Sequence, residues 1–328
     1  MKKLMSMLIV LILACGICMP AQGDPAGSMP VIPYRFASAE EGKQLKMANR
    51  EYFEKTTLNK LGFIMHDDNA TLEEYMAFTE QQVLDWTDAE KKLIDECMEI
   101  IEQSFTRNGW EMPPLETVVF IRTTMREENG AFGYTHGTQI YLSSMLEQYA
   151  AYPTEQIGVP VATILAHELF HCLTRCNPEF RKDMYSIIHF TVTDRDYDLP
   201  PSVLEYYIAN PDVEHHNAFA SFLIDGKETD CFTAFVTTKH AEKPEETFMD
   251  FGVTALVPAD GTDTWYTADR ASNFDEIFGT NTGYVIDPEE CLADNFSYAV
   301  IYGEQGPEGK GYPNPEIIEA IMAYLSGN

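Results

Sequence analysis

Residues 166–172 read Ala-His-Glu-Leu-Phe-His-Cys, a His-Glu-x-x-His core inside a segment whose pattern is typical of a helix. Residues four apart lie on one face of a helix, so His167 and His171 can present two imidazoles to one metal ion. Glu168 stands one step round the helix, where it can take a proton from a metal-bound water instead of binding the metal. This spacing points to the chemistry of a zinc hydrolase.

The sequence around the motif predicts a buried helix. Pro160 is suited to the first helical position, and we expect the helix to begin there. Apolar residues then recur at helical spacing, which a solvated surface helix would not show. They are Val161, Ile164, Leu165, Leu169 and Leu173. The alternative reading of the motif is a pair of hydrogen-bonded structural histidines with no metal.

A zinc site needs a third protein ligand, and two familiar sources of it are excluded. The metzincin pattern requires glycine at position 174 and histidine at 177, where this chain has Thr174 and Asn177. A family with an aspartate ligand would show a Gly-Thr-x-Asp run, but Gly279-Thr280 continues with Asn281 and Thr282. The third ligand must therefore come from a different segment.

A second predicted helix begins at Asp287 and supplies the best candidate. Asp287 is placed as the N-cap, proline follows at the first helical position, and acids fill the first turn. Glu290 and Asp294 are four apart and share a face, so Glu290 can bind a metal while Asp294 accepts the free ring N–H of a ligating histidine. Glu289 has only Ala293 at that offset, and we expect it to interact favourably with the helix dipole at a modest 0.3–1 kcal/mol or so.

The Glu-x-x-x-Asp spacing after a His-Glu-x-x-His helix resembles the gluzincin group of metallopeptidases, the thermolysin-like enzymes. The resemblance implies that His167, His171 and Glu290 bind Zn²⁺, that Glu168 is the general base and that Asp294 supports His167. It covers the two helices alone. Glu290 lies 119 residues after His171, far more than in thermolysin-like enzymes, so something the size of a small subdomain must intervene.

The same resemblance implies a tyrosine that stabilises the oxyanion. Gluzincins carry one a few residues before the glutamate ligand, and Tyr284 stands six residues before Glu290. A phenolic O–H can donate to the developing charge. The alternative is that Tyr284 only packs beneath the helix start, with Tyr298 and His216 as rival donors. His215 and His216 are otherwise expected to be solvated.

The first 23 residues have the pattern of a bacterial export signal. Lys2 and Lys3 precede an apolar run that ends at Cys18 and is too short to span a bilayer as a mature helix. Residues 12–15 approximate a lipobox with Cys15 as the lipidated residue, and small residues at 21–23 offer ordinary cleavage. We expect an exported protein, whether secreted, periplasmic or held at a membrane through Cys15.

Charge and composition limit the partners. Removal of Lys2 and Lys3 with the signal leaves 20 basic against 52 acidic side chains, a net charge near −32. Such a surface repels nucleic acid and anionic lipid headgroups, so a nucleic-acid partner is not expected. The protein or peptide substrate is what the resemblance to metallopeptidases implies. The oligomeric state stays open.

The five cysteines after the signal are scattered along the chain, and we expect them to pack as small apolar side chains in the core instead of forming a disulfide framework. They are Cys97, Cys172, Cys176, Cys231 and Cys291.

The expected fold class is α+β, with a zincin-like catalytic domain at 87–328 after a signal peptide at 1–23 and an N-terminal segment at 24–86. Whether residues 24–80 act as a prosegment stays open. The domain is expected to contain an active-site helix, a mixed sheet and a β-rich insertion at 177–286. Its predicted elements are a helix capped by Thr87 and Glu90, strands at 116–124 and 132–143, hairpins around 225–226 and 259–261, and a last helix from Asn314 to about Leu325. The strand containing residues 139–142 is expected to be the edge that pairs with an extended substrate.

Two classes of protein remain open. The first is an exported zinc endopeptidase in which Glu168 activates a zinc-bound water to attack a peptide carbonyl. The second is a non-catalytic binding or surface protein with a zincin fold and a structural zinc. Glu168 favours the enzyme, because a purely structural site has no use for a base at that position.

Overall fold

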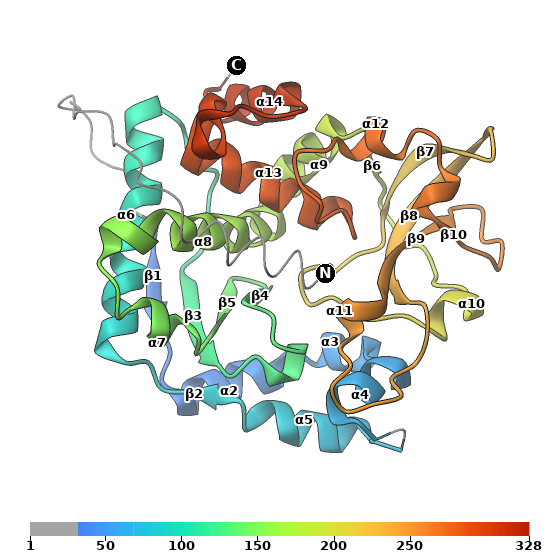
Figure 1. The fold of residues 1–328 in the computed structure, drawn as a ribbon, viewed down its shortest axis with the longest axis horizontal. Coiled ribbons are helices and arrows are strands. Elements are labelled where there is room, and N and C mark those ends of the chain that lie inside the picture. Colours follow the sequence, from blue (N-terminus) through green and yellow to red (C-terminus); the bar gives the residue numbers. More distant parts are fainter. Residues whose placement is uncertain (1–31, 68, 328) are drawn as a thin grey trace.

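The structure is a computed structural model that describes residues 32–67 and 69–327. The predictions of a signal peptide at 1–23 and of lipidation at Cys15 therefore lie outside the described residues. Within them the chain has an α+β fold, in which helices pack beside a mixed five-stranded sheet and a second, antiparallel five-stranded sheet (Figure 1).

The mixed sheet is built around one fully buried strand. β3 (Val118–Thr123) pairs in parallel with β1 (Tyr34–Phe36) and with β5 (Gln139–Ser143), and all six of its side chains are buried. β2 (Val83–Leu84) and β4 (Gly133–His136) add antiparallel pairs. The strand predicted at 116–124 is thus confirmed. Two of the five strands, β1 and β2, come from the N-terminal segment of the chain.

The sequence expectation for residues 132–143 is wrong in one respect. A single strand was expected, and the structure has two, joined at Gly137, whose φ of +56° suits glycine. β4 is the edge of the sheet, and β5, which contains residues 139–142, lies between β4 and β3. Because β5 is paired on both sides, its backbone cannot receive a substrate strand, and β4 takes the position expected for it.

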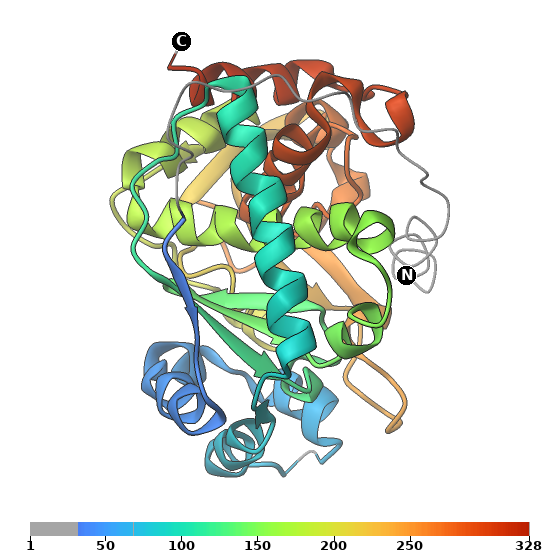
Figure 2. The same ribbon diagram turned by 90° about the vertical axis from the view of Figure 1, so that its left-hand side faces the viewer.

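Helices α6 (Asp88–Asn108) and α8 (Thr154–Cys176) cross beside this sheet (Figure 2). α6 begins with the predicted capping box of Thr87 and Glu90. α8 is as long and apolar as a membrane-spanning helix, yet most of it is buried inside the protein. The predicted start at Pro160 is wrong, because the helix begins at Thr154. Pro160 thus lies inside the helix, where proline cannot donate the usual N–H bond to the carbonyl of Gln156 and its ring crowds that carbonyl.

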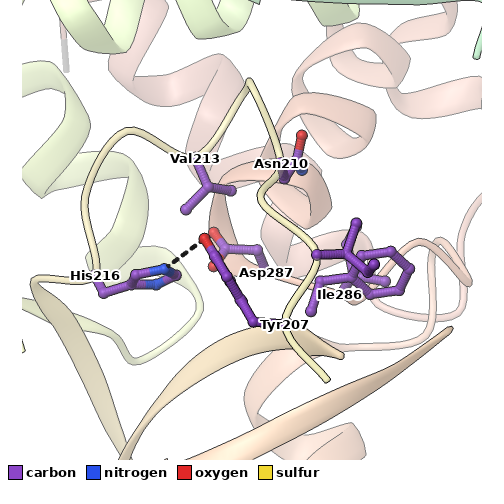
Figure 3. Close-up of a pocket in the computed structure, with 8 residues that line it drawn as sticks. Tyr207, Asn210, Val213, His216, Ile286 and Asp287 are labelled. Carbon is purple, nitrogen blue, oxygen red and sulfur yellow. Dashed lines mark hydrogen bonds between the residues drawn. The ribbon is translucent and has the colours of Figure 1, made fainter. Parts of the chain in front are cut away.

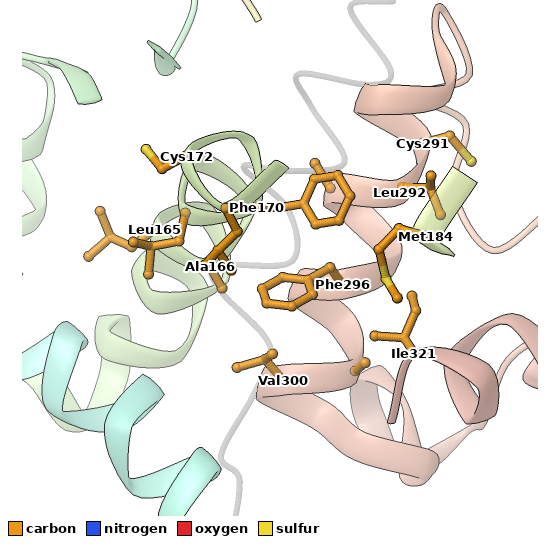
Figure 4. Close-up of a cluster of buried hydrophobic side chains, with 14 of the residues drawn as sticks. Leu165, Ala166, Phe170, Cys172, Met184, Cys291, Leu292, Phe296, Val300 and Ile321 are labelled. Carbon is orange, nitrogen blue, oxygen red and sulfur yellow. The ribbon is translucent and has the colours of Figure 1, made fainter. Parts of the chain in front are cut away.

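The core lies between α8 and the C-terminal helices. α13 (Pro288–Tyr302) packs along α8, and Figure 4 shows Phe170 of α8 and Phe296 of α13 facing each other, with ring centroids 5.4 Å apart. α9 (Pro178–Ile187) and α14 (Pro315–Leu325) close the cluster with Met184 and Ile321. The predicted helix starts at Asp287 and Asn314 are confirmed. This packing fixes the two candidate ligand-bearing helices side by side.

The second sheet has the strand order β10-β9-β8-β7-β6 and is antiparallel throughout. In the chain it falls between α8 and α13, which agrees with the predicted β-rich character of residues 177–286. The predicted hairpins are present, at Asp225-Gly226 and between β9 and β10. The strands are β6 (Thr191–Val192), β7 (Ala218–Ile224), β8 (Lys227–Thr237), β9 (Gly252–Pro258) and β10 (Tyr266–Thr267).

Short helices complete the fold. At the N-terminal end these are α2 (Ala39–Ala48), α3 (Arg50–Lys55), α4 (Leu58–Met65) and α5 (Leu72–Glu80). Further along the chain they are the 3₁₀ turn η1 (Arg126–Glu128), α7 (Leu146–Tyr149), α10 (Pro201–Leu204), α11 (Phe248–Phe251) and α12 (Phe274–Phe278). The five described cysteines are free thiols, and all except Cys176 are buried, as expected from their scattered positions.

Candidate metal centre

Two helices bring the three predicted ligands together. α8 places His167 and His171 on the face that packs against α13, and α13 places Glu290 opposite them. Asp287 caps α13 by accepting the backbone N–H of Glu289, which fixes the first turn where Glu290 lies. His171 and Glu290 are buried, and the His167 side chain is 14 % exposed.

The spacing of the donor atoms fits a tetrahedral metal ion. Glu290 Oε2 lies 3.1 Å from His167 Nε2 and 3.6 Å from His171 Nε2. A tetrahedral zinc with bonds of about 2.0–2.1 Å separates its ligand atoms by roughly 3.3–3.4 Å. Nε2 of His171 is also buried with no hydrogen-bond partner among the described residues. The group can therefore hold a metal ion, and its two nitrogens and one carboxylate oxygen are donors that suit zinc.

The other nitrogen of each imidazole is held by a carboxylate. His167 Nδ1–H donates to Asp294 Oδ1 at 2.8 Å, as the sequence predicted, and Asp294 is in turn held by the hydroxyl of Thr282. His171 Nδ1–H donates to Glu289 Oε1 at 3.1 Å. Contacts of this kind fix the tautomer and leave both Nε2 atoms for a metal.

The minor role expected for Glu289 is therefore wrong. Its carboxylate is buried and also accepts hydrogen bonds from Thr174 Oγ1 at 2.6 Å and from Tyr185 Oη at 2.7 Å. The expectation of a helix-dipole residue failed because Thr174 and Tyr185 lie more than 100 positions earlier in the chain. Glu289 instead positions His171.

Glu168 lies beside this donor set and against β4. An ideal Cβ at Gly133 would lie 2.3 Å from Glu168 Oε1, so only glycine leaves room for the carboxylate. Glu168 Oε2 is buried and has no hydrogen-bond partner among the described residues. Burial, together with nearby Asp212, raises the pKa of Glu168 to about 8.

The carboxylates around the histidines make the site attractive to cations. Burial by itself would lower the pKa of His167, but its hydrogen bonds to Asp294 and Glu290 outweigh that effect and hold the pKa well above the usual value. In the same way, Asp212, Glu289 and Glu290 outweigh burial and raise the pKa of His171 to about 10. The negative field that retains protons on these rings would equally stabilise a divalent cation.

Two site residues were missed by the sequence reasoning. Asp212 is buried, and one of its carboxylate oxygens lies within 4.8 Å of both a Glu168 oxygen and a nitrogen of His171. Asn210 donates its side-chain amide N–H to Glu290 Oε1. The only sequence signal was the polar Asn-Pro-Asp run at 210–212, which reads as an ordinary turn.

The side chains considered as oxyanion donors lie in different parts of the structure. Tyr284 stacks on His167, with ring centroids 6.2 Å apart and an angle of 28° between the planes. Tyr298 packs against other tyrosines at 302 and 312. His216 bonds to Tyr207 Oη in a small neighbouring pocket (Figure 3). Of these three candidates, only Tyr284 contacts a candidate ligand. The neighbouring His215 is exposed and pairs with an aspartate at 196.

Comparison with known proteins gives no match to a family model, to a curated protein or to a solved structure. The candidate function therefore depends on the geometry of the site and on its chemistry.

Proposed function

We propose that this chain is an exported, zinc-dependent metallopeptidase with a zincin-like catalytic domain of the gluzincin type. The observation that carries the proposal is the convergence of His167, His171 and Glu290 on one point, with each imidazole oriented by its own carboxylate. A structural site has no need of the unpartnered carboxylate of Glu168 next to it.

The residues divide the chemistry between them. A zinc ion bound by His167, His171 and Glu290 would supply Lewis acidity and lower the pKa of a water. Glu168 accepts the proton of the attacking water and later passes it to the leaving amine. Tyr284, stacked on His167, donates its O–H to the oxyanion that develops on the carbonyl.

The edge of the mixed sheet provides a place for the substrate backbone. β4 is unpaired on one side within the sheet, and its Gly133 lies against Glu168. An extended peptide that pairs with this edge brings its carbonyl beside the base. The reaction class that follows is hydrolysis of a peptide bond in an extended segment.

One observation favours the second candidate, a non-catalytic zincin-fold binding protein with a structural zinc. His167, at 14 %, is the most exposed of the proposed ligands, and Glu168 is only 4 % exposed. A structural site is closed in this way, whereas a catalytic site keeps an open position. The two candidates differ in turnover, not in metal content.

The experiment measures metal content and cleavage of an unfolded protein in the same preparations. We expect one zinc per wild-type chain and cleavage that a chelator abolishes. Glu290→Ala should lose both, and the exposed-acid control Glu276→Ala should retain both. Zinc without cleavage would favour the binding protein. Equal zinc in Glu290→Ala and wild type would contradict the proposed ligand set.

A further inference from the structure

Residues 210–214, which we call the strap, contact the candidate metal centre at two points. At one end Asn210 donates to the ligand Glu290, and in the middle Asp212 approaches Glu168 and His171. Figure 3 shows Asn210 and Val213 on this segment, close to Asp287 at the start of α13. The strap thus belongs to the site, although it comes from the loop between α10 and β7.

Asp212 lies near two residues that each have a buried polar atom without a hydrogen bond in the described part of the chain. His171 Nε2 and Glu168 Oε2 are buried and unpartnered among the described residues, and donor atoms of both residues lie within 4.8 Å of an Asp212 oxygen. His171 is also common to the group with His167 and Glu290. Asp212 therefore lies on the Glu168 side of His171, and a tetrahedral site with three protein ligands has room for one further donor.

Asp212 also occupies the substrate edge of the sheet. Ser143 N–H donates to the carbonyl of Phe132 next to β4, and hydrogen-bonded pairs alternate along an antiparallel ladder. The N–H of Thr135 therefore points away from β5, toward the free edge. Asp212 Oδ1 accepts this N–H at 2.7 Å and the Thr135 hydroxyl at 2.5 Å. A substrate carbonyl would need the same donor.

The strap is held in place by two cationic side chains. Arg175 of α8 donates to the carbonyls of Pro211 at 3.1 Å and Asp212 at 3.2 Å, and its Nε lies 2.8 Å from Glu214. Lys60 donates to the carbonyl of Ala209, just before the strap, at 2.7 Å. These bonds join the strap to α8 and α4, so they must break before the strap can leave the site.

We infer that Asp212 is the fourth protein donor of the metal centre and that the strap closes the site until it is displaced from β4. The inference rests on the proposed function and deepens it, because it makes the described conformation a latent one. The Asp212 side chain occupies the fourth coordination position and also accepts the Thr135 N–H. An extended peptide needs the first for its carbonyl at the metal and the second for its hydrogen bond to β4, so it can bind only after residues 210–214 leave.

The test uses Co²⁺ as the metal and acetohydroxamic acid as the probe for an open coordination position. Co²⁺ visible absorption reports the donor set, and titration with acetohydroxamic acid reports access. Asp212→Ala opens the position, and Asp212→Asn retains an oxygen that can accept the Thr135 N–H while losing the charged donor. Glu205→Gln, an exposed acid on the same loop, is the matched control.

We expect acetohydroxamic acid to bind Asp212→Ala at least about tenfold more tightly than wild type or Glu205→Gln, because the competing carboxylate is gone. The Co²⁺ spectrum should change in both Asp212 variants. Amide hydrogen exchange at Thr135 should be at least about tenfold faster in Asp212→Ala and nearly unchanged in Asp212→Asn. Thermal unfolding checks that each variant is folded.

Equal acetohydroxamic acid affinity in wild type and Asp212→Ala, with equal exchange at Thr135, would overturn the inference while leaving the proposed function intact. Absence of Co²⁺ binding in wild type would overturn the proposed function and the fourth donor together. If Asp212→Ala does not fold, Asp212→Asn decides by its Co²⁺ spectrum alone, and an unchanged spectrum would contradict the assignment of Asp212 as a donor.

Discussion

Two buried polar clusters lie close together in this protein and differ in how their charges are balanced. In the first, called the lysine network, Lys46 and Lys60 are fully buried with Glu127 and Glu128. Lys60 Nζ lies 2.6 Å from Glu128 Oε2, and Lys46 reaches Glu127 through the hydroxyl of Tyr134. Two cations thus face two carboxylates.

The second cluster, the candidate metal centre, has an excess of acid. Its five carboxylates are Glu168, Asp212, Glu289, Glu290 and Asp294. Two arginines approach them from the margin, Arg175 at 4.0 Å from Asp212 and Arg181 at 4.0 Å from Glu289. Uncompensated buried charge is costly, so the excess of carboxylates must be balanced either by protons on His167 and His171, whose pKa values are raised, or by a cation bound in their place. The lysine network, although equally buried, balances its carboxylates with its own cations.

The largest effect should come from the base of the metal centre. Glu168→Gln keeps the ligands and removes proton transfer, so turnover should fall by about 10²–10⁴ with zinc content unchanged. Steady-state kinetics and metal analysis measure this. The matched control is Glu127→Gln in the lysine network, where turnover per folded molecule should not change. Undiminished hydrolysis in Glu168→Gln would exclude the proposed mechanism.

The lysine network should respond in stability. Lys60→Met leaves Glu128 buried without its cation and removes the bond to Ala209, so the free energy of unfolding should fall by about 3–5 kcal/mol. Urea unfolding measures the change. Lys92→Met, at an exposed i,i+4 pair with Glu96, should cost less than about 1 kcal/mol. Similar costs in the two variants would show that the network is not tightly balanced.

The oxyanion assignment can be tested by deleting one hydroxyl. Tyr284→Phe keeps the ring that stacks on His167, so zinc content and folding should persist. If Tyr284 is the donor, turnover should fall by about 10²–10³. A decrease of less than a few-fold would make Tyr284 a packing residue, and the donor would then have to be sought elsewhere in the site.

The smallest effects should come from the two carboxylates that hold the histidines. Asp294→Ala and Glu289→Ala should each weaken zinc affinity by about 10–100-fold, because each frees one imidazole to rotate. Competition with a coloured chelator measures the affinities, with Glu276→Ala as an unaffected control. Wild-type affinity in Asp294→Ala would show that its contact with His167 does not contribute to the site.

Local sequence patterns predicted the two helices of the candidate metal centre and the turns of the antiparallel sheet. The helical spacing of His167 and His171, and the Asp-Pro start before Glu290, depend on neighbours within two turns and could be read directly. The two hairpins of the antiparallel sheet were also visible, because their turn residues are local signals.

The remaining features depend on contacts between distant residues. Asp212 hydrogen-bonds to Thr135, which lies 77 positions away in the sequence, and the Asn-Pro-Asp run does not predict this contact. The order of strands in the mixed sheet, which makes β4 the edge instead of β5, is likewise a tertiary property. The start of α8 was predicted wrongly because proline usually lies at the start of a helix, whereas tertiary packing here stabilises a helix that continues on both sides of Pro160.

The most direct test of the account is anomalous diffraction at the zinc absorption edge from crystals of the wild-type protein grown with zinc. We predict one peak at about 2.0–2.2 Å from His167 Nε2, His171 Nε2 and a Glu290 oxygen, and none in the lysine network. Absence of a peak between α8 and α13, or a peak beside Glu127 and Glu128 instead, would contradict the claim that the acidic excess marks a metal site.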